Sequence, residues 1–392
     1  MKHLILLFGA IFLLFLFTGC QKESTSSPSA DVLKNSSKSS STNQIVLKAK
    51  LDKMLASMPV GYQSRLADNQ RRFLKQHPEY RQFVVNAVVP TACDDNTRLN
   101  QWINGELSDW NSTVFFYAVV TGMLDFPTYD ALLFENNPST QYFGLKGEHT
   151  QTVTKTLKDL QRFWNIQSSG IVAVAMHGNM LRDRDRVIRI DKILFEDSQA
   201  DAEFTADFIN LLLDVFPQYR NGNHPIFTFN AFAQPAFDFP PFGHIPDKIV
   251  MGDGIMAAYT ALGFDDVAPQ AILAHEFGHH IQFQLGLFSD VESPEETRRT
   301  ELMADAYSAY FLAHSRGASM QWKRVREFLQ VFYNIGDCAF TDNQHHGTPT
   351  QRMAAADWAY SVVNAAQNQG HILTSQQFTA LFEAQLPILV SH

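Results

Sequence analysis

Apolar residues recur three and four positions apart through the first part of the chain, which is the spacing of one buried helix face. The pattern is clearest in residues 47–58, 62–76 and 79–89. No cluster of polar residues in this region suggests chemistry. Residues 46–165 are therefore expected to form a mainly helical region that acts as a scaffold or as a wall beside the substrate.

Short apolar runs bounded by turn residues follow and predict strands. They are Gly170–Met176, Val187–Ile190, Ile226–Phe229 and Lys248–Met251. A long helix is expected over about Ala202–Phe216, and the prolines and aromatic residues of 234–245 predict an irregular loop. This order predicts an α+β domain over residues 166–392, with a twisted mixed sheet followed by two helices that carry the chemistry.

One helix of special interest is predicted between Pro269, near its start, and Gly286, just past its end. His275 and His279 are four positions apart, so both imidazoles project from neighbouring turns and can bind one tetrahedral zinc ion. Glu276 lies beside this pair. There it can take a proton from a water that zinc activates, without occupying a coordination position.

Zinc needs a third protein ligand. The longer motif with a third histidine fails, because Gln282 and Leu285 stand where its glycine and histidine would fall. Residues 293–296, Ser-Pro-Glu-Glu, form a capping box that opens a second helix. On this helix Glu301 and Asp305 share one face. We expect Glu301 to bind the zinc and Asp305 to accept a hydrogen bond from a ligand histidine.

Alternatives remain at this point. Glu295 and Glu296 are rival ligands, although the positive end of the helix dipole explains acidic residues in a first turn without any metal. A core helix with two hydrogen-bonded histidines would produce the same pattern, because His-Glu-x-x-His fixes only three residues. Asp305 could also serve only as a cap or as a partner of Arg352.

Three ordered motifs carry a resemblance to a known family. They are HEFGHHIQ at 275–282, ELMADAYSAYF at 301–311 and HGTPTQR at 346–352. They resemble the HExGHHxQ, ExxAD and HGxxxQR segments of a bacterial family of neutral zinc metallopeptidases, which are gluzincin-like. The resemblance covers about residues 246–360 and not the N-terminal half. It implies a zincin-like fold, zinc held by the two motif histidines and Glu301, and catalysis by Glu276.

Three other polar residues of these motifs have expected roles. His280 points about 100° round the helix from its neighbour and is not expected to bind the metal. His346 is a candidate donor to the oxyanion that develops during peptide cleavage, with His345 as a competitor and a structural loop histidine as the alternative. Arg352 is a candidate anchor for this loop through a bidentate bond to a carboxylate such as Asp305.

Residues 1–19 have the pattern of a bacterial signal peptide. Lys2 precedes an apolar run from Leu4 to Phe17 that is too short to span a bilayer. The run ends in Phe-Thr-Gly-Cys, which resembles a lipobox and predicts that Cys20 is acylated and becomes the anchored N-terminus. An ordinary secretion signal is the alternative. Residues 20–45 are rich in serine and threonine and are expected to form a tether.

Composition and charge narrow the partners. With 45% hydrophobic residues the chain is globular, and its net charge of −9 provides no basic stripe for nucleic acid. Membrane attachment is expected only through the N-terminal lipid. The predicted location is extracytoplasmic, in the cell envelope, and Gln21 after the cysteine favours the outer membrane. There Cys93 and Cys338 could form a disulfide or remain buried thiols.

These observations predict a zinc peptidase that acts on a peptide or protein. Zinc-activated water attacks the carbonyl, and Glu276 takes the proton and delivers it to the leaving amine. The substrate is expected to add as a strand along an edge near Ile249–Met251. An envelope lipoprotein that keeps a zincin core only for binding or assembly is the alternative, although it would not need Glu276. A zinc hydrolase of a non-peptide amide is a third reading.

Overall fold

The structure is a computed structural model, and it describes residues 41–62, 65, 96–240, 243–289, 293–336, 345–364 and 370–391. The signal peptide, Cys20, both other cysteines and most of the helices predicted over 62–76 and 79–89 lie outside these residues. Within them, no helix is long and apolar enough to cross a membrane.

The N-terminal region is helical where it is described, as its apolar spacing predicts. The first helix begins inside the segment expected to be a tether, so residues 41–45 are helical. Asn111 begins one of these helices by accepting hydrogen bonds from the backbone N–H groups of Thr113 and Val114. The helices are α1 (Ser41–Ala56), α3 (Arg98–Glu106), α4 (Ser112–Val120), α5 (Phe126–Tyr129) and α6 (Thr150–Phe163).

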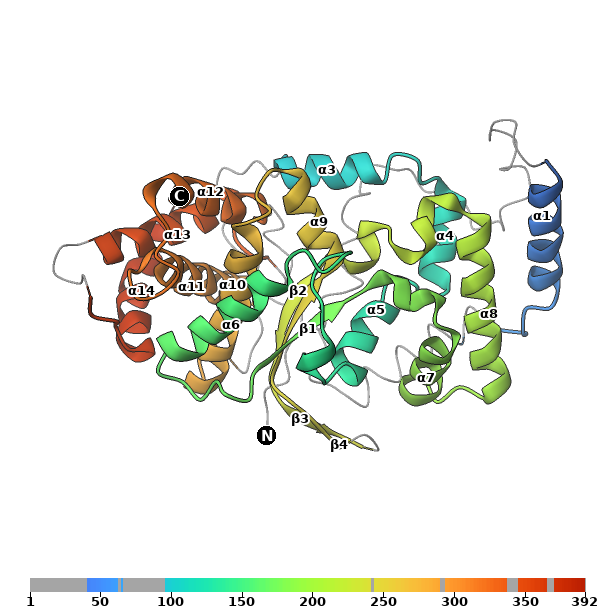
Figure 1. Cartoon of the computed structure of the whole chain (residues 1–392), viewed down its shortest axis with the longest axis horizontal. Coiled ribbons are helices and arrows are strands. Elements are labelled where there is room, and N and C mark those ends of the chain that lie inside the picture. The colour runs from blue at the N-terminus through green and yellow to red at the C-terminus, as the bar shows by residue number, and fades with distance from the viewer. Residues whose placement is uncertain are drawn as a thin grey trace.

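A three-stranded mixed sheet lies at the centre of the molecule (Figure 1). Strand β5 (Lys248–Gly252) pairs in parallel with β1 (Val172–Met176) and antiparallel with β2 (Ala231–Gln234). The strands predicted over the first and last apolar runs are thus confirmed. Because β5 is central, both of its edges are already paired, and the expectation that a substrate adds near Ile249–Met251 is wrong. The edge strand on that side is β2.

Two predicted strands are helical instead. Val187–Ile190 lies inside α7 (Arg184–Leu194), whose start is capped by the Asp183 side chain. The run is so short that its apolar residues fit the spacing of a buried helix face as well as that of a strand. Pro225–Thr228 forms a 3₁₀ turn where the third strand was expected. The expected long helix is confirmed as α8 (Gln199–Val215).

The segment expected to be an irregular loop contains a short hairpin. Its strands are β3 (Phe237–Phe239) and β4 (Gly243–Ile245), which pair antiparallel with each other. Figure 1 shows this hairpin extending beyond the end of the central sheet.

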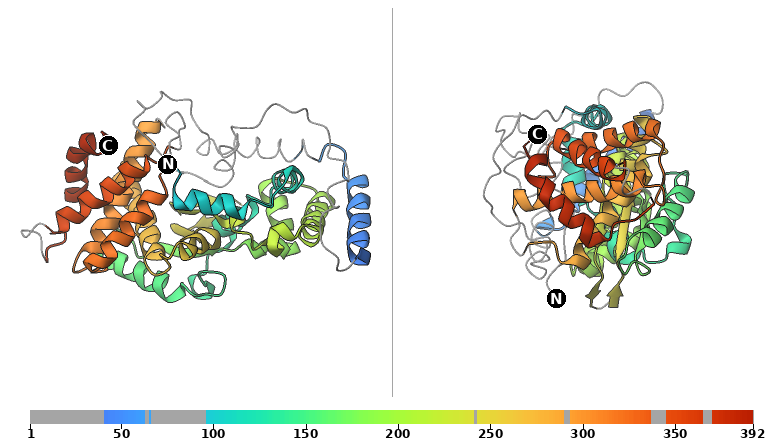
Figure 2. Two further views of the ribbon diagram at one scale, coloured as in Figure 1. Left: turned by 90° about the horizontal axis from the view of Figure 1, so that it is seen from above. Right: turned by 90° about the vertical axis from the view of Figure 1, so that its left-hand side faces the viewer.

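The C-terminal part is a group of helices on one side of the sheet. Ser293 caps the helix that begins at Pro294, by accepting a hydrogen bond from the Glu296 N–H. Figure 2 shows the last helices at one end of the molecule and α1 at the other. The helices are α9 (Asp253–Ala261), α10 (Ala268–Leu285), α11 (Pro294–Ala313), α12 (Trp322–Asn334), α13 (Pro349–Asn364) and α14 (Ser375–Leu389).

Alternate residues of the sheet face two hydrophobic cores, as the period of a strand requires. Ala173 and Ile249 pack into a core shared with α6 and with α9 to α14. Val174 and Val250 pack into a second core with α4, α5, α7 and α8. The first core also contains Leu99, so side chains on both sides of residue 165 share one interior.

Candidate metal centre

Helix α10 carries the two motif histidines through the protein interior. Pro269 lies in its first turn, and Gly286 ends it in the left-handed region at φ 64°, as predicted. His275 and Glu276 are buried, and His279 is half-buried. The histidines therefore sit on a rigid element whose ends and orientation are set by local sequence.

Helices α10 and α11 approach closely where two small residues meet. A Cβ on Gly278 would lie 3.1 Å from the Cα and 3.3 Å from the Cβ of Ala304. Further along, the Ser308 hydroxyl donates to the Ala271 carbonyl oxygen at 2.9 Å. This close packing brings Glu301, one turn before Ala304, to the histidines on either side of Gly278.

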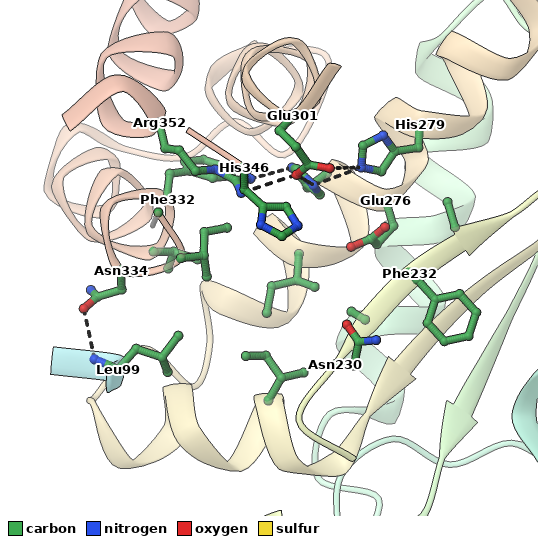
Figure 3. Close-up of a pocket in the computed structure, with 18 of the residues that line it drawn as sticks. Leu99, Asn230, Phe232, Glu276, His279, Glu301, Phe332, Asn334, His346 and Arg352 are labelled. Carbon is green, nitrogen blue, oxygen red and sulfur yellow. Dashed lines mark hydrogen bonds and ion pairs between the residues drawn. The ribbon is translucent and has the colours of Figure 1, made fainter. Parts of the chain in front are cut away.

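The side chains of His275, His279 and Glu301 meet, and Figure 3 shows Glu301 and His279 facing each other. The Nε2 atoms of His275 and His279 are 3.2 Å apart. The carboxylate oxygens of Glu301 lie 3.3 Å from the first and 3.4 Å from the second of these nitrogens. Zinc–ligand distances of about 2.0–2.1 Å in a tetrahedron place ligands about 3.3–3.4 Å apart. The two nitrogens thus have the spacing of two corners of a zinc tetrahedron, and Glu301 approaches each of them through a different carboxylate oxygen.

Each histidine is oriented through its other ring nitrogen. His275 Nδ1 lies 2.9 Å from Asp305 Oδ1, and His279 Nδ1 lies 2.8 Å from Gln282 Oε1. These oxygens accept, so each Nδ1 carries a proton, and each Nε2 is the ring nitrogen that a metal ion would bind. The two Nε2 atoms and the carboxylate of Glu301 then face one another, and positive charge between them, from a proton or a metal ion, holds them together. A cation stabilises such an arrangement, and the donor set fits zinc.

Asp305 is fully buried and serves two partners. Its carboxylate oxygens accept from Arg352 Nε and Nη2, each at 2.7 Å, while one of them faces His275. Arg352 Nη1 also lies 3.3 Å from Glu301. The two contacts expected as alternatives for Asp305, to a ligand histidine and to Arg352, are therefore both present.

Gln282 is an orienting residue that the sequence analysis did not assign. Its Oε1 faces His279 and its Nε2 donates to the Thr300 carbonyl oxygen at 2.7 Å, so the amide has a single orientation. The signal was present in the sequence. Gln282 lies three positions after His279, on the same helix face, and is the last letter of HExGHHxQ.

Two nitrogen ligands and one carboxylate form a donor set that zinc uses in catalytic sites. Comparisons of the chain with models of protein families, with curated proteins and with solved structures gave no match. The geometry and chemistry of these side chains are therefore the basis for assigning a function.

The rival residues lie away from this point. Glu295 and Glu296 are in the first turn of α11, where Glu296 pairs with Arg299 at 3.2 Å, and neither lines the cavity described below. His280 is buried against the sheet, with its Nε2 2.9 Å from the carbonyl oxygen of Lys248. Its position agrees with the expectation that it does not bind the metal.

Burial and neighbouring charges shift the pKa values of the site. Burial raises the pKa of Glu276. The nearby His275 and His279 act to lower it, but their effect is smaller than that of burial. Burial also acts to raise the pKa of Glu301, but the two histidines outweigh it and hold that pKa well below its usual range. Burial acts to lower the pKa of His275, whereas hydrogen bonds to Asp305 and Glu301 raise it to about 10. Glu301 is thus ionised, as a metal ligand must be.

A cavity of about 190 Å³ opens beside the three converging residues. Glu276 and His346 both point into it from the side of the histidines, and Asn230 faces it from the start of β2 (Figure 3). His345 is fully buried and does not line the cavity, so His346 is the better placed of the two. The rest of the wall is mainly apolar, with residues from α3, α9, α10, α12 and the position just after α12: Leu99, Ile103, Ile255, Ile272, Val331, Phe332 and Ile335.

Proposed function

We propose that this chain is a zincin-like, zinc-dependent peptidase in which His275, His279 and Glu301 hold the metal and Glu276 is the base. The observation that carries the proposal is the separation of 3.2–3.4 Å among the ligand atoms. The Nδ1 atoms of both histidines are already engaged by other acceptors. Zinc, when bound, polarises the substrate carbonyl and lowers the pKa of a coordinated water towards about 7.

Glu276 is placed to move protons in both halves of the reaction. One of its carboxylate oxygens lies within 4.8 Å of the ring nitrogens of His275 and His279, which leaves room for one attacking water between them. Burial raises the pKa of Glu276, so it can hold the proton taken from that water. It then delivers this proton to the leaving amine nitrogen as the peptide bond breaks.

His346 and Arg352 have different roles in this proposal. His346 points into the cavity and donates a hydrogen bond to the carbonyl oxygen as that oxygen gains negative charge. The charge of Arg352 is already paired with Asp305 and Glu301, so this arginine positions the ligand groups and does not act on substrate.

The peptide is proposed to bind along the edge of β2. Residues 231–233 of this strand line the cavity, and β2 is hydrogen-bonded to β5 on its other side. An extended peptide that pairs with β2 would present its backbone carbonyl to the metal ligands. This replaces the sequence-based expectation of pairing at β5.

The location remains the one proposed from the N-terminal sequence. A lipid on Cys20 would hold the peptidase at the outer membrane and give it access to peptides in the envelope.

Zinc content and cleavage of a mixed peptide pool test the proposal in the wild type and three variants. We expect Glu276→Gln to keep zinc and lose cleavage, Glu301→Gln to lose zinc, and the control Glu295→Gln to change neither. Cleavage that persists in Glu276→Gln would show that Glu276 is not the base. Zinc binding without cleavage in the wild type would favour the alternative of a binding or assembly protein.

A further inference from the structure

The apolar side of the cavity is built partly by a helix that lies far from the zinc motifs in sequence. Leu99 and Ile103 are one turn apart on α3, and both are almost completely buried. They line the same cavity as Glu276 and His279. In Figure 3, Leu99 lies across the cavity from these two residues, beside Asn334.

Hydrogen bonds through Asn334 join α3 to the end of α12. The Asn334 Oδ1 accepts from the Leu99 N–H at 3.3 Å, and its backbone carbonyl accepts from the Thr97 hydroxyl at 3.1 Å. Its Nδ2 donates to the Gln330 carbonyl oxygen at 2.6 Å. Asn334 is itself 2% exposed, so the amide is held inside the protein. The wall formed by α3 is therefore fixed relative to α12.

The charged groups of the cavity lie away from Leu99. The ionisable side chains that line the cavity, including Glu276, Glu301 and Arg352, gather around the metal ligands. The neutral lining residues include Leu99 and Ile103 of α3 with Ile255, Val331 and Ile335, and the polar residues next to Leu99 are the uncharged Asn100 and Asn334. A charged side chain placed there would lose its hydration without gaining an ion partner, whereas a large apolar side chain would be removed from water.

We propose that Leu99 and Ile103 determine substrate specificity, as the far wall of a pocket that takes one large apolar side chain of the peptide. The inference rests on the proposed peptidase function and assigns the substrate class. The N-terminal helical region then contributes to the site itself, through α3, and is more than a scaffold. A phenylalanine at position 103 would occupy the pocket and leave room only for a small side chain.

Peptides that differ at one residue beside the cleaved bond test this wall. The wild type should cleave the leucine and phenylalanine peptides with kcat/KM about 10-fold or more above the alanine, aspartate and lysine peptides. Ile103→Phe should lose most of that preference while it retains cleavage of the alanine peptide. Asn104→Phe, on the exposed face of the same helix, should leave the preference unchanged. Unaltered preference in Ile103→Phe would overturn the proposal.

A binding measurement separates this inference from the proposed activity. The probes are N-acetyl-phenylalanine amide and N-acetyl-alanine amide, titrated by NMR into Glu276→Gln alone and combined with Ile103→Phe. Tighter binding of the phenylalanine amide that disappears in the double variant supports the pocket, even if no peptide is cleaved by the wild type. Equal binding of both amides to the single variant would overturn it.

A folding defect is the remaining concern for a buried position. Ile103→Val removes one methylene, so it enlarges the pocket with little cost to the fold. With an unchanged melting temperature, this variant should cleave the tryptophan peptide better relative to the leucine peptide. An unchanged ratio of these two rates in folded Ile103→Val would count against α3 as the wall.

Discussion

Asp305 and Arg352 form a bidentate ion pair directly behind His275, with both donor–acceptor distances at 2.7 Å. The side chains are at most 3% exposed. One carboxylate therefore neutralises a buried guanidinium and also fixes the tautomer of a histidine that faces the proposed metal. Stability and metal binding are coupled at this residue.

Asp305→Ala is expected to impair both properties. It leaves Arg352 charged and buried without its main partner, which typically costs about 3–5 kcal/mol of unfolding free energy. It also removes the acceptor for His275 Nδ1, which should weaken zinc binding about 10–100-fold. Thermal unfolding and a zinc titration measure the two effects separately.

The double variant Asp305→Ala with Arg352→Met is the control, because it removes the stranded charge, and it is compared with Arg352→Met alone because Arg352 also contacts Glu301. Its stability should recover towards the wild type, while its zinc affinity stays low. Recovery of zinc affinity together with stability would mean that Asp305 affects zinc binding only by stabilising the folded protein.

Gln282 should increase zinc affinity, although it contacts His279 through Nδ1 and not through the Nε2 atom that faces the proposed metal. In Gln282→Ala, His279 Nδ1 loses its acceptor, and zinc affinity should fall by about 10-fold or more. Gln282→Glu keeps an oxygen for His279 but loses the donor to Thr300. It should therefore bind zinc better than the alanine variant. Equal affinities in the two variants would argue against an orienting role.

The parts of the site that follow helical spacing could be predicted from sequence. His275 and His279 on one helix, and Glu301 and Asp305 on another, depend only on periodicity and caps within each helix. Their approach in space depends on packing. It requires the small pair Gly278 and Ala304, whose contact no local pattern reveals.

Strand order and the residues of the far wall could not be predicted, because both depend on contacts between distant parts of the chain; for the N-terminal helices, a wall beside the substrate is only one of two expected roles. The sequence of Lys248–Met251 indicates a buried strand, but not that β5 is paired on both sides. Likewise, the sequence shows Leu99 only as one apolar position of a predicted helix, without its neighbours in space. Its hydrogen bond to Asn334, 235 positions later, and its packing in the core shared with α9 to α14 hold it at the cavity.

Gly278→Ala should separate the two helices of the site. The added methyl group would lie 3.1–3.3 Å from backbone and side-chain atoms of Ala304, so α10 and α11 must move apart. Such overpacking typically costs about 1–3 kcal/mol. Zinc affinity should fall as well, because Glu301 moves with α11.

A matched control is Gly105→Ala in α3, where no atom lies within 4 Å of an added Cβ. Alanine there should leave zinc affinity unchanged and add at most about 0.5–1 kcal/mol of stability, since Gly105 lies in the last turn of α3 and does not have a positive φ. Unchanged zinc affinity in Gly278→Ala would show that the ligand positions tolerate a wider helix separation.

Lys248 should make stability depend on pH in a defined direction. It is fully buried in β5, and its ammonium donates to the carbonyl oxygens of Ala131, Leu132 and Glu135. Burial lowers the pKa of Lys248 from 10.5 to about 7, although nearby carboxylates oppose this. Between these two values the unfolded chain binds more protons than the folded one. The contribution of Lys248 to the unfolding free energy should therefore rise with pH, by about 2–4 kcal/mol from pH 7 to pH 10.

Lys248→Met is the reference for this measurement, because it removes the titrating group and keeps a long apolar stem. It leaves three carbonyl oxygens without their donor, so it should be less stable than the wild type at every pH. The informative quantity is the difference in unfolding free energy between the two proteins, measured by urea titration at several pH values. A difference that widens from pH 7 to pH 10 supports the lowered pKa, since only the wild type has a lysine that binds a proton in the unfolded chain but not in the folded one over this range. A difference that stays constant would mean that the three carbonyl oxygens keep Lys248 charged inside the protein as firmly as water does outside it.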